Sequence, residues 1–305
     1  MAKVYFGLFY DVDRDAPPKD RLVTFANPEI AATALDGFVA ALGRPDIPSP
    51  KMIGEAQAEG QDYLLGFPVL AGLDVLATKS LADVRLLPAA TLQSGLAFHY
   101  AIVSDREREW VDPLIESMPD LAAEALMAYW RPLLAHNLKN IMGLYALVHE
   151  DMMKPVAKRV ALILLKDYPN AQEDSLELFL HAALRDGDRT ELLSHAHHVI
   201  SHQTPLTDDN KSLWYAVAFA LDHESAKSGL EEHLRGKAEQ AARILNFLSP
   251  SHGIKSDTPY PLTVAALASL IVMMGPIFHP RNLSGSLAIR GPEGAASSIQ
   301  SLIHS

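Results

Sequence analysis

The stretch that decides the fold is NPEIAATALDGFVAALGRP, residues 27–45. Asn27 followed by Pro28 is a typical helix start, because an asparagine side chain caps free backbone amides and proline fits the first turn. A glycine and a proline then end the pattern at residues 43 and 45. Between these signals, apolar residues recur at the spacing of one helix face: Ile30, Ala34, Leu35, Phe38 and Leu42. The stretch therefore predicts a single amphipathic helix.

Start and stop signals of this kind recur along the whole chain, about every fifteen to twenty residues. Ser49-Pro50 opens the next helix, which we expect to stop at Gly60. Further helices are predicted over residues 63–78, 88–103, 106–117, 119–136, 139–149, 152–168, 173–186, 189–202, 207–222, 224–235, 237–248, 261–275 and 293–304.

Short connections between these segments make consecutive helices antiparallel neighbours, so the predicted fold class is all-α. Helix and hairpin lengths favour an irregular α-solenoid of antiparallel helical hairpins, similar to HEAT repeats, although no strict repeat consensus is present. A globular helical bundle is the alternative. We expect an N-terminal helical segment with an irregular start at 1–86 and a stacked-hairpin region at 87–305, continuous with the first.

Two segments depart from the common pattern. Residues 4–10 have the aromatic and β-branched content of a strand, but one strand cannot form a sheet, so this segment is equally read as a helix cut short. Residues 258–278 carry no Asp, Glu, Lys or Arg and are long enough to cross a bilayer. Prolines and glycines interrupt this segment, which favours a buried core helix with Leu262, Ala265, Ala266, Ser269 and Met273 on its packed face.

Composition excludes several classes of function. The formal charge of −11 and the pI near 5.6 argue against nucleic acid as a partner, because phosphate binding needs clustered Lys and Arg. The chain has no cysteine, which excludes disulfides, thiolate metal sites and cysteine nucleophiles and fits a reducing compartment. The apolar run near Met1 is too short for a signal peptide. We expect a cytoplasmic protein that binds no membrane.

Motifs for catalysis are missing from the sequence. It contains no GxxxxGK[ST] phosphate-binding loop and no GxSxG nucleophile motif. We therefore predict no catalytic residue, no cofactor and no enzymatic activity.

One helix carries a candidate metal site. On the predicted helix 189–202, Glu191, His195, His198 and His202 share a face, and imidazoles three or four residues apart can reach one metal ion. No established metal-binding motif accompanies them, and solvated polar side chains are the alternative interpretation.

Three strings together resemble a known family. They are RPDIPSPKMIGEAQAEGQDYLLGFPVLAGLD at 44–74, SLELFLHAALRDGDRTELLSHA at 175–196 and RNLSGSLAIRGPEGAASSIQSLIHS at 281–305. This pattern resembles the helical region that follows the NTPase domain in large bacterial NACHT-type NTPases of the STAND class. The resemblance implies a non-enzymatic sensor, autoinhibitory or interaction arm linked to defence against phage. This chain has no Walker motif, so it looks like a separated arm or part of a split gene.

Three hypotheses about function follow. The first is a helical scaffold that binds a protein partner, such as an NTPase or a phage component. The second is a metal-binding protein or enzyme that uses the histidine-rich helix, and the third is a gene remnant without present function. None of these three hypotheses specifies the oligomeric state.

Overall fold

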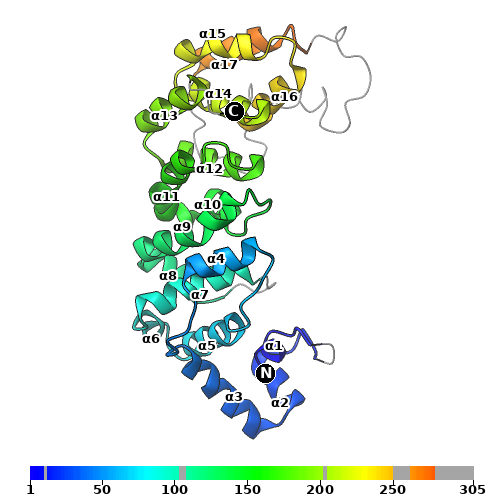
Figure 1. Ribbon diagram of the computed structural model, residues 1–305, viewed down its shortest axis with the longest axis vertical. Helices are drawn as coiled ribbons and strands as arrows, with labels where there is room; N and C mark the ends of the chain where they lie inside the picture. Colours follow the sequence, from blue (N-terminus) through cyan, green and yellow to red (C-terminus); the bar gives the residue numbers. More distant parts are fainter. Residues whose placement is uncertain (10–11, 103–107, 202–204, 250–261, 279–305) are drawn as a thin grey trace. The chain divides into compact units, whose positions relative to one another are not determined.

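The computed structural model describes residues 1–9, 12–102, 108–201, 205–249 and 262–278 (Figure 1). Within these residues the secondary structure consists of seventeen α-helices and one short 3-10 helix, and no strand is present. The predicted all-α fold class is therefore confirmed.

Contacts between residues divide the chain into two units, Met1–Gly143 and Leu144–Ser305. The predicted division at residues 86/87 falls inside the first unit, where the helix Gly66–Lys79 contacts the helix Ala89–Ala101. The helices of the first unit are α1 (Ala2–Tyr5), α2 (Pro18–Phe25), α3 (Pro28–Ala41), α4 (Pro50–Ala58), α5 (Gly66–Lys79), α6 (Leu81–Arg85), α7 (Ala89–Ala101), α8 (Val111–Ser117) and α9 (Pro119–Ala135). Those of the second are α10 (Leu144–His149), η1 (Asp151–Met153), α11 (Lys154–Asp167), α12 (Glu173–Asp186), α13 (Arg189–Ser201), α14 (Asp208–Leu221), α15 (His223–His233), α16 (Ala238–Leu248) and α17 (Val264–Met274).

Helix starts follow the capping residues of the sequence. The Asn27 side chain accepts a 2.8 Å hydrogen bond from the amide of Ile30, and Thr207 caps α14 in the same way. The predicted helices from 27 to 275 are all present, with some starts a few residues later than expected. Two short helices, α2 and α6, were not predicted. The predicted helix 293–304 lies outside the described residues.

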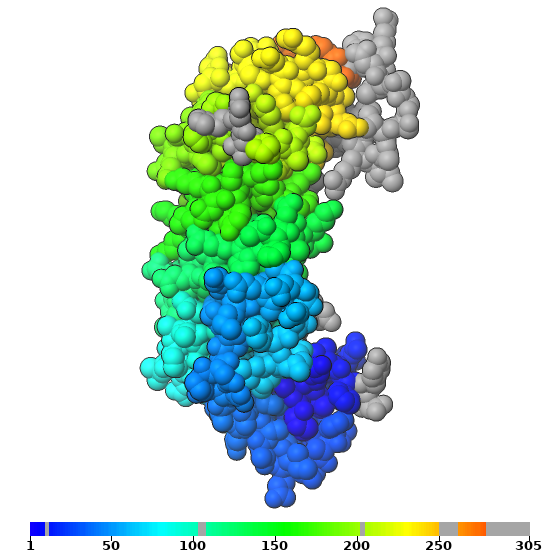
Figure 2. Space-filling view, viewed as in Figure 1, coloured from blue at the N-terminus to red at the C-terminus, as the bar shows by residue number. Residues whose placement is uncertain are grey.

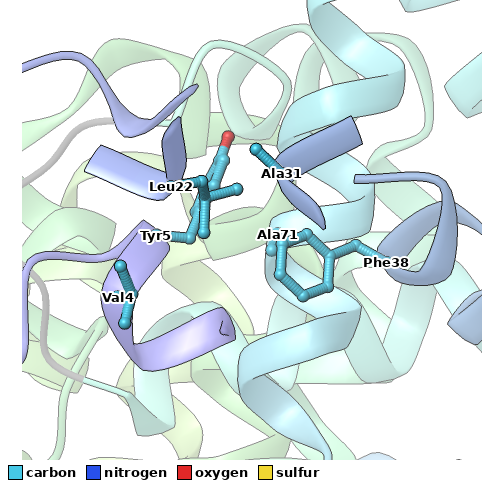
Figure 3. Packing of buried hydrophobic residues seen from close by; sticks show 6 residues of the cluster. All are labelled: Val4, Tyr5, Leu22, Ala31, Phe38 and Ala71. Atoms are coloured by element: carbon cyan, nitrogen blue, oxygen red, sulfur yellow. The ribbon is translucent and has the colours of Figure 1, made fainter. Parts of the chain in front are cut away.

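The irregular N-terminal segment is held by a hydrophobic cluster. Residues 2–5 form the short helix α1, so only the first two residues of the ambiguous stretch 4–10 are helical; residues 6–9 form a turn and a bend, and none of the described residues of the stretch is in a strand. Arg21 fixes the following loop, since its Nε and Nη1 donate to the carbonyl oxygens of Asp13 and Tyr5 at 3.0 Å each. Figure 3 shows this cluster, which consists of Val4, Tyr5, Leu22, Ala31, Phe38 and Ala71.

The first unit is closely packed, and glycine allows two of its closest approaches. The backbone of α4 approaches that of α9 so closely that a Cβ on Gly54 would collide with the carbonyl oxygen of Tyr129. On α5, a Cβ on Gly72 would collide in the same way with the carbonyl oxygen of Phe38 on α3. The small residues in these helices therefore set how near their neighbours lie.

In the second unit, helices contact near neighbours in chain order. α11 packs on α12, α12 on α14, and α14 on α16, while α13 and α15 each contact α14 as well. Side-chain hydrogen bonds to backbone carbonyl oxygens hold the connections between these helices in place. Arg185 donates to the carbonyl oxygens of Leu147 and Val148 at the end of α10, and Trp214 Nε1 donates to Pro169 O at 2.9 Å.

The uncharged segment near residue 270 differs from its prediction. No helix in the described part of the chain is both long and apolar enough to span a bilayer. α17 is, however, not a fully buried core helix, because it buries Ala266, Leu270 and Met274 and leaves its opposite face exposed. Ala265, predicted on the packed face, is exposed.

Candidate functional site

The histidine-rich helix α13 is the site proposed from sequence. Glu191 is exposed and forms an ion pair with Lys166 of α11. His195 is half-buried, with Nε2 lying 3.3 Å from the carbonyl oxygen of Leu165 and its ring edge-on to Trp214 at 5.3 Å. Burial lowers the pKa of His195, because it disfavours the charged imidazolium. Neighbouring helices therefore already engage two of the four candidates.

The three candidates that the structure describes, Glu191, His195 and His198, do not form a group that could hold a metal ion. The rings of His195 and His198 lie 6.4 Å apart and nearly parallel, at 18°. Among the described residues, no group of three or more His, Asp or Glu side chains could hold a metal ion. His202, the fourth candidate, lies outside the described residues. A metal site formed by all four residues therefore stays a prediction.

A second polar cluster, centred on Asp74, was missed by sequence reasoning. Arg108 Nη1 donates to Asp74 Oδ2 and Trp110 Nε1 to Asp74 Oδ1, both at 2.8 Å. The Arg108 side chain is 2% exposed, and its guanidinium lies 4.9 Å from the ring centroid of Phe6. The two hydrogen bonds therefore hold the Asp74 carboxylate of α5 against the segment before α8.

A cavity of about 420 Å³ opens beside this cluster. Its walls come from α1, α2, α5 and the segment before α8, and they include Tyr5, Thr78, Glu109 and Trp110. Close by, the half-buried His99 packs against Tyr100 and Trp110, and desolvation together with the nearby Arg108 lowers its pKa to about 4. Asp74, the only acidic residue of the apolar helix α5, was the sequence signal for this cluster, since a charge in a largely buried helix needs a partner.

The second unit contains a Ser–His pair that resembles a catalytic arrangement. Ser212 Oγ lies 2.9 Å from His233 Nε2 and donates to the carbonyl oxygen of Asp208 at 2.8 Å. A hydroxyl has one proton, so His233 must be the donor toward Ser212. A nucleophile needs the reverse direction and access to substrate, and Ser212 is fully buried. The pair therefore holds α15 against α14.

The exposed apolar side chains of the N-terminal segment form a different kind of surface. Phe9 and Phe25 are 46% and 44% exposed, and their rings pack edge-on at 5.5 Å between centroids. Leu8 is also 46% exposed. We call these three residues the N-terminal apolar patch. Phe25 belongs to α2, whose Leu22 is part of the buried cluster in Figure 3.

Comparison of the chain with protein-family models, with curated proteins and with solved structures gave no match. The contacts and exposed surfaces of the chain itself are therefore the basis for assigning a function.

Proposed function

We propose that this chain is a non-enzymatic helical scaffold that binds a protein partner. The observation that carries the proposal is the N-terminal apolar patch. Two aromatic side chains and a leucine stand exposed on an anchored surface, and clustered exposed apolar residues mark protein interaction sites.

The roles of the polar clusters support the same proposal. The Asp74 cluster ties the segment before α8 to α5, and the Ser212–His233 pair ties α15 to α14. On α13, Glu191 and His195 contact residues of α11. Each of these groups fixes one helix against another, which is what a rigid scaffold requires.

Helix order and sequence resemblance extend the proposal. The contacts from α11 through α12 and α14 to α16 fit an irregular solenoid of hairpins, the arrangement we propose for the scaffold. The resemblance of residues 44–74, 175–196 and 281–305 to the arm of NACHT-type NTPases suggests a sensor or regulatory role. An NTPase, or a phage component that such a system senses, is the partner we expect.

The test is affinity capture of the tagged chain from its native cells, followed by mass spectrometry. Recovery of an NTPase with the wild type, and its loss with Phe9→Asp combined with Phe25→Asp, would support the proposal. Leu86→Asp is the matched control, because Leu86 is 82% exposed on the same unit and ends α6, which Figure 1 shows apart from α1 and α2. Equal recovery with both variants would reject the patch as the binding surface.

The same preparation separates the scaffold from the metal-binding alternative. Metal analysis of the purified chain should give much less than one zinc or nickel per chain. One bound metal ion per chain, lost in His198→Ala, together with no captured partner, would overturn the proposal in favour of the α13 site.

A further inference from the structure

α17 is the least polar helix of the described chain and has two contrasting faces. Its sequence, VAALASLIVMM, contains no charged residue. Thr263 caps its start by accepting a 3.1 Å hydrogen bond from the amide of Ala266. One stripe, Ala266, Leu270 and Met274, is at most 2% exposed, and the helix lies beside α15 (Figure 1).

The opposite face of α17 is apolar and open to the surface. Val264 is 86% exposed and Val272 is 74% exposed, and the orange atoms of this helix are visible at the surface in Figure 2. At 100° per residue, the exposed positions form one continuous face about 120° wide. We call it the outer face of α17, and it consists of Val264, Ala265, Ala268, Ile271, Val272 and Gly275. A helix that is apolar all round is normally covered on all sides.

The chain itself supplies a segment that fits this face. Residues 279–305 follow α17 directly and lie outside the described residues. Their sequence predicts a helix at 293–304 with Ile299, Leu302 and Ile303 at helical spacing on one side. Between residues 294 and 303 there is no Asp, Glu, Lys or Arg, so packing against the outer face would bury no charge.

Length and shape agree with this match. Eleven residues of α17 extend over about 16 Å, and a twelve-residue helix extends over about 18 Å. The intervening residues 279–292 include two prolines and two glycines and span up to about 45 Å when extended, which is ample for a return. Small side chains on the outer face, Ala265 and Ala268, offer space for the bulky Ile299 and Leu302.

We propose that the outer face of α17 is the docking surface for residues 293–304 of the same chain. Tethering favours this occupant over a separate molecule, because a short linker holds the segment at an effective concentration in the millimolar range. The inference does not depend on the scaffold function or on the N-terminal apolar patch.

The absence of cysteine from the sequence allows a clean crosslinking test. Ala268→Cys combined with Ser298→Cys, treated with a short thiol-reactive crosslinker at low protein concentration, should give a crosslinked monomer of increased gel mobility. The control pairs Ser298→Cys with Glu239→Cys, which is exposed on α16, and should give none. Crosslinks only between chains would replace the proposal with a dimer through this face, and an absence of crosslinks in both would reject docking.

A second measurement does not require introduced cysteines. Leu302→Asp and Val272→Asp should each increase the fluorescence of a hydrophobic dye and the amide hydrogen exchange of α17, because each separates the same two surfaces. The double variant should add little to either single variant, as coupled residues do. Additive effects, or no effect of Leu302→Asp, would overturn the proposal.

Discussion

α16 and α17 are both eleven residues long, yet their sequences carry different amounts of information about packing. α16 alternates polar and apolar residues at helical spacing, and every residue that it buries is apolar: Ala241, Ile244, Leu245, Phe247 and Leu248. α17 is apolar all round, and only part of it is buried. A helical pattern thus identifies the buried face only when polar residues mark the other face.

The largest expected effect is at Phe247 on the buried face of α16. Phe247 is 1% exposed and stacks on His181 at 4.2 Å between ring centroids. Phe247→Ala should lower the free energy of unfolding by about 3–5 kcal/mol, because it removes a large buried ring and leaves a cavity. Chemical denaturation followed by circular dichroism measures this loss.

Glu239→Gln is the matched control on the exposed side of α16, and its change should stay within about 0.5 kcal/mol. If Phe247→Ala lowers the free energy of unfolding by less than about 1 kcal/mol, the amphipathic face of α16 does not anchor the helix. The contrast drawn between α16 and α17 would then be wrong for α16.

The next effect is at Leu270 on α17. Leu270→Ala should lower the free energy of unfolding by about 2–3 kcal/mol. This loss is near the lower end for a buried leucine, because α17 packs on the rest of the described unit mainly through α15. Leu270→Met keeps the volume and should cost less than about 1.5 kcal/mol in the same denaturation experiment. If Met273→Ala costs more than Leu270→Ala, the face predicted from sequence anchors α17 and the stripe that contains Leu270 does not.

The sequence was sufficient for the positions of most helices and insufficient for what they contact. Caps such as Asn27 and Thr207 accept hydrogen bonds from amides three residues away, so helix starts can be predicted from the local sequence. The contact between Asp74 and Arg108 joins residues 34 positions apart, and no local pattern encodes it. The orientation of α17 could not be predicted, because its exposed Val264 and its buried Leu270 are both apolar.

The same limit explains the outcome at the histidine-rich helix. Helical spacing correctly places Glu191 and His195 one turn apart on α13. Their partners, Lys166 and Leu165, belong to the end of α11. Whether a polar side chain is available to a ligand depends on such neighbours, which become known only when the helices are packed.

A third prediction concerns α15, the helix that carries α17. Burial, with Lys237 and Lys211 nearby, lowers the pKa of His233 to about 4 from an ordinary value near 6.5. Between these pH values the unfolded chain binds a proton that the folded chain does not, so stability decreases as the pH falls from 6.5 to about 4. His233 should contribute about 1–3 kcal/mol of this loss.

His233→Gln provides the comparison, because glutamine can still donate to Ser212 but does not titrate. The variant should be less stable than the wild type at pH 7 by about 1 kcal/mol and show a shallower dependence of unfolding free energy on pH. Parallel pH profiles for the two proteins would show that His233 is not the group responsible.

The smallest expected effect is the surface ion pair at the start of α16. Lys237 Nζ lies 2.8 Å from Asp208 Oδ2, and the two side chains are 36% and 56% exposed. The hydrogen bond from Lys237 lowers the pKa of Asp208, yet exposed pairs of this kind contribute only about 0.2–1 kcal/mol. A double-mutant cycle with Lys237→Gln and Asp208→Asn should give a coupling energy in that range at low salt and close to zero in about 1 M salt, where the screening length is about 3 Å. A coupling that persists in high salt would mean that charge, and not the apolar pattern, orients α16, and the contrast with α17 would then need a different explanation.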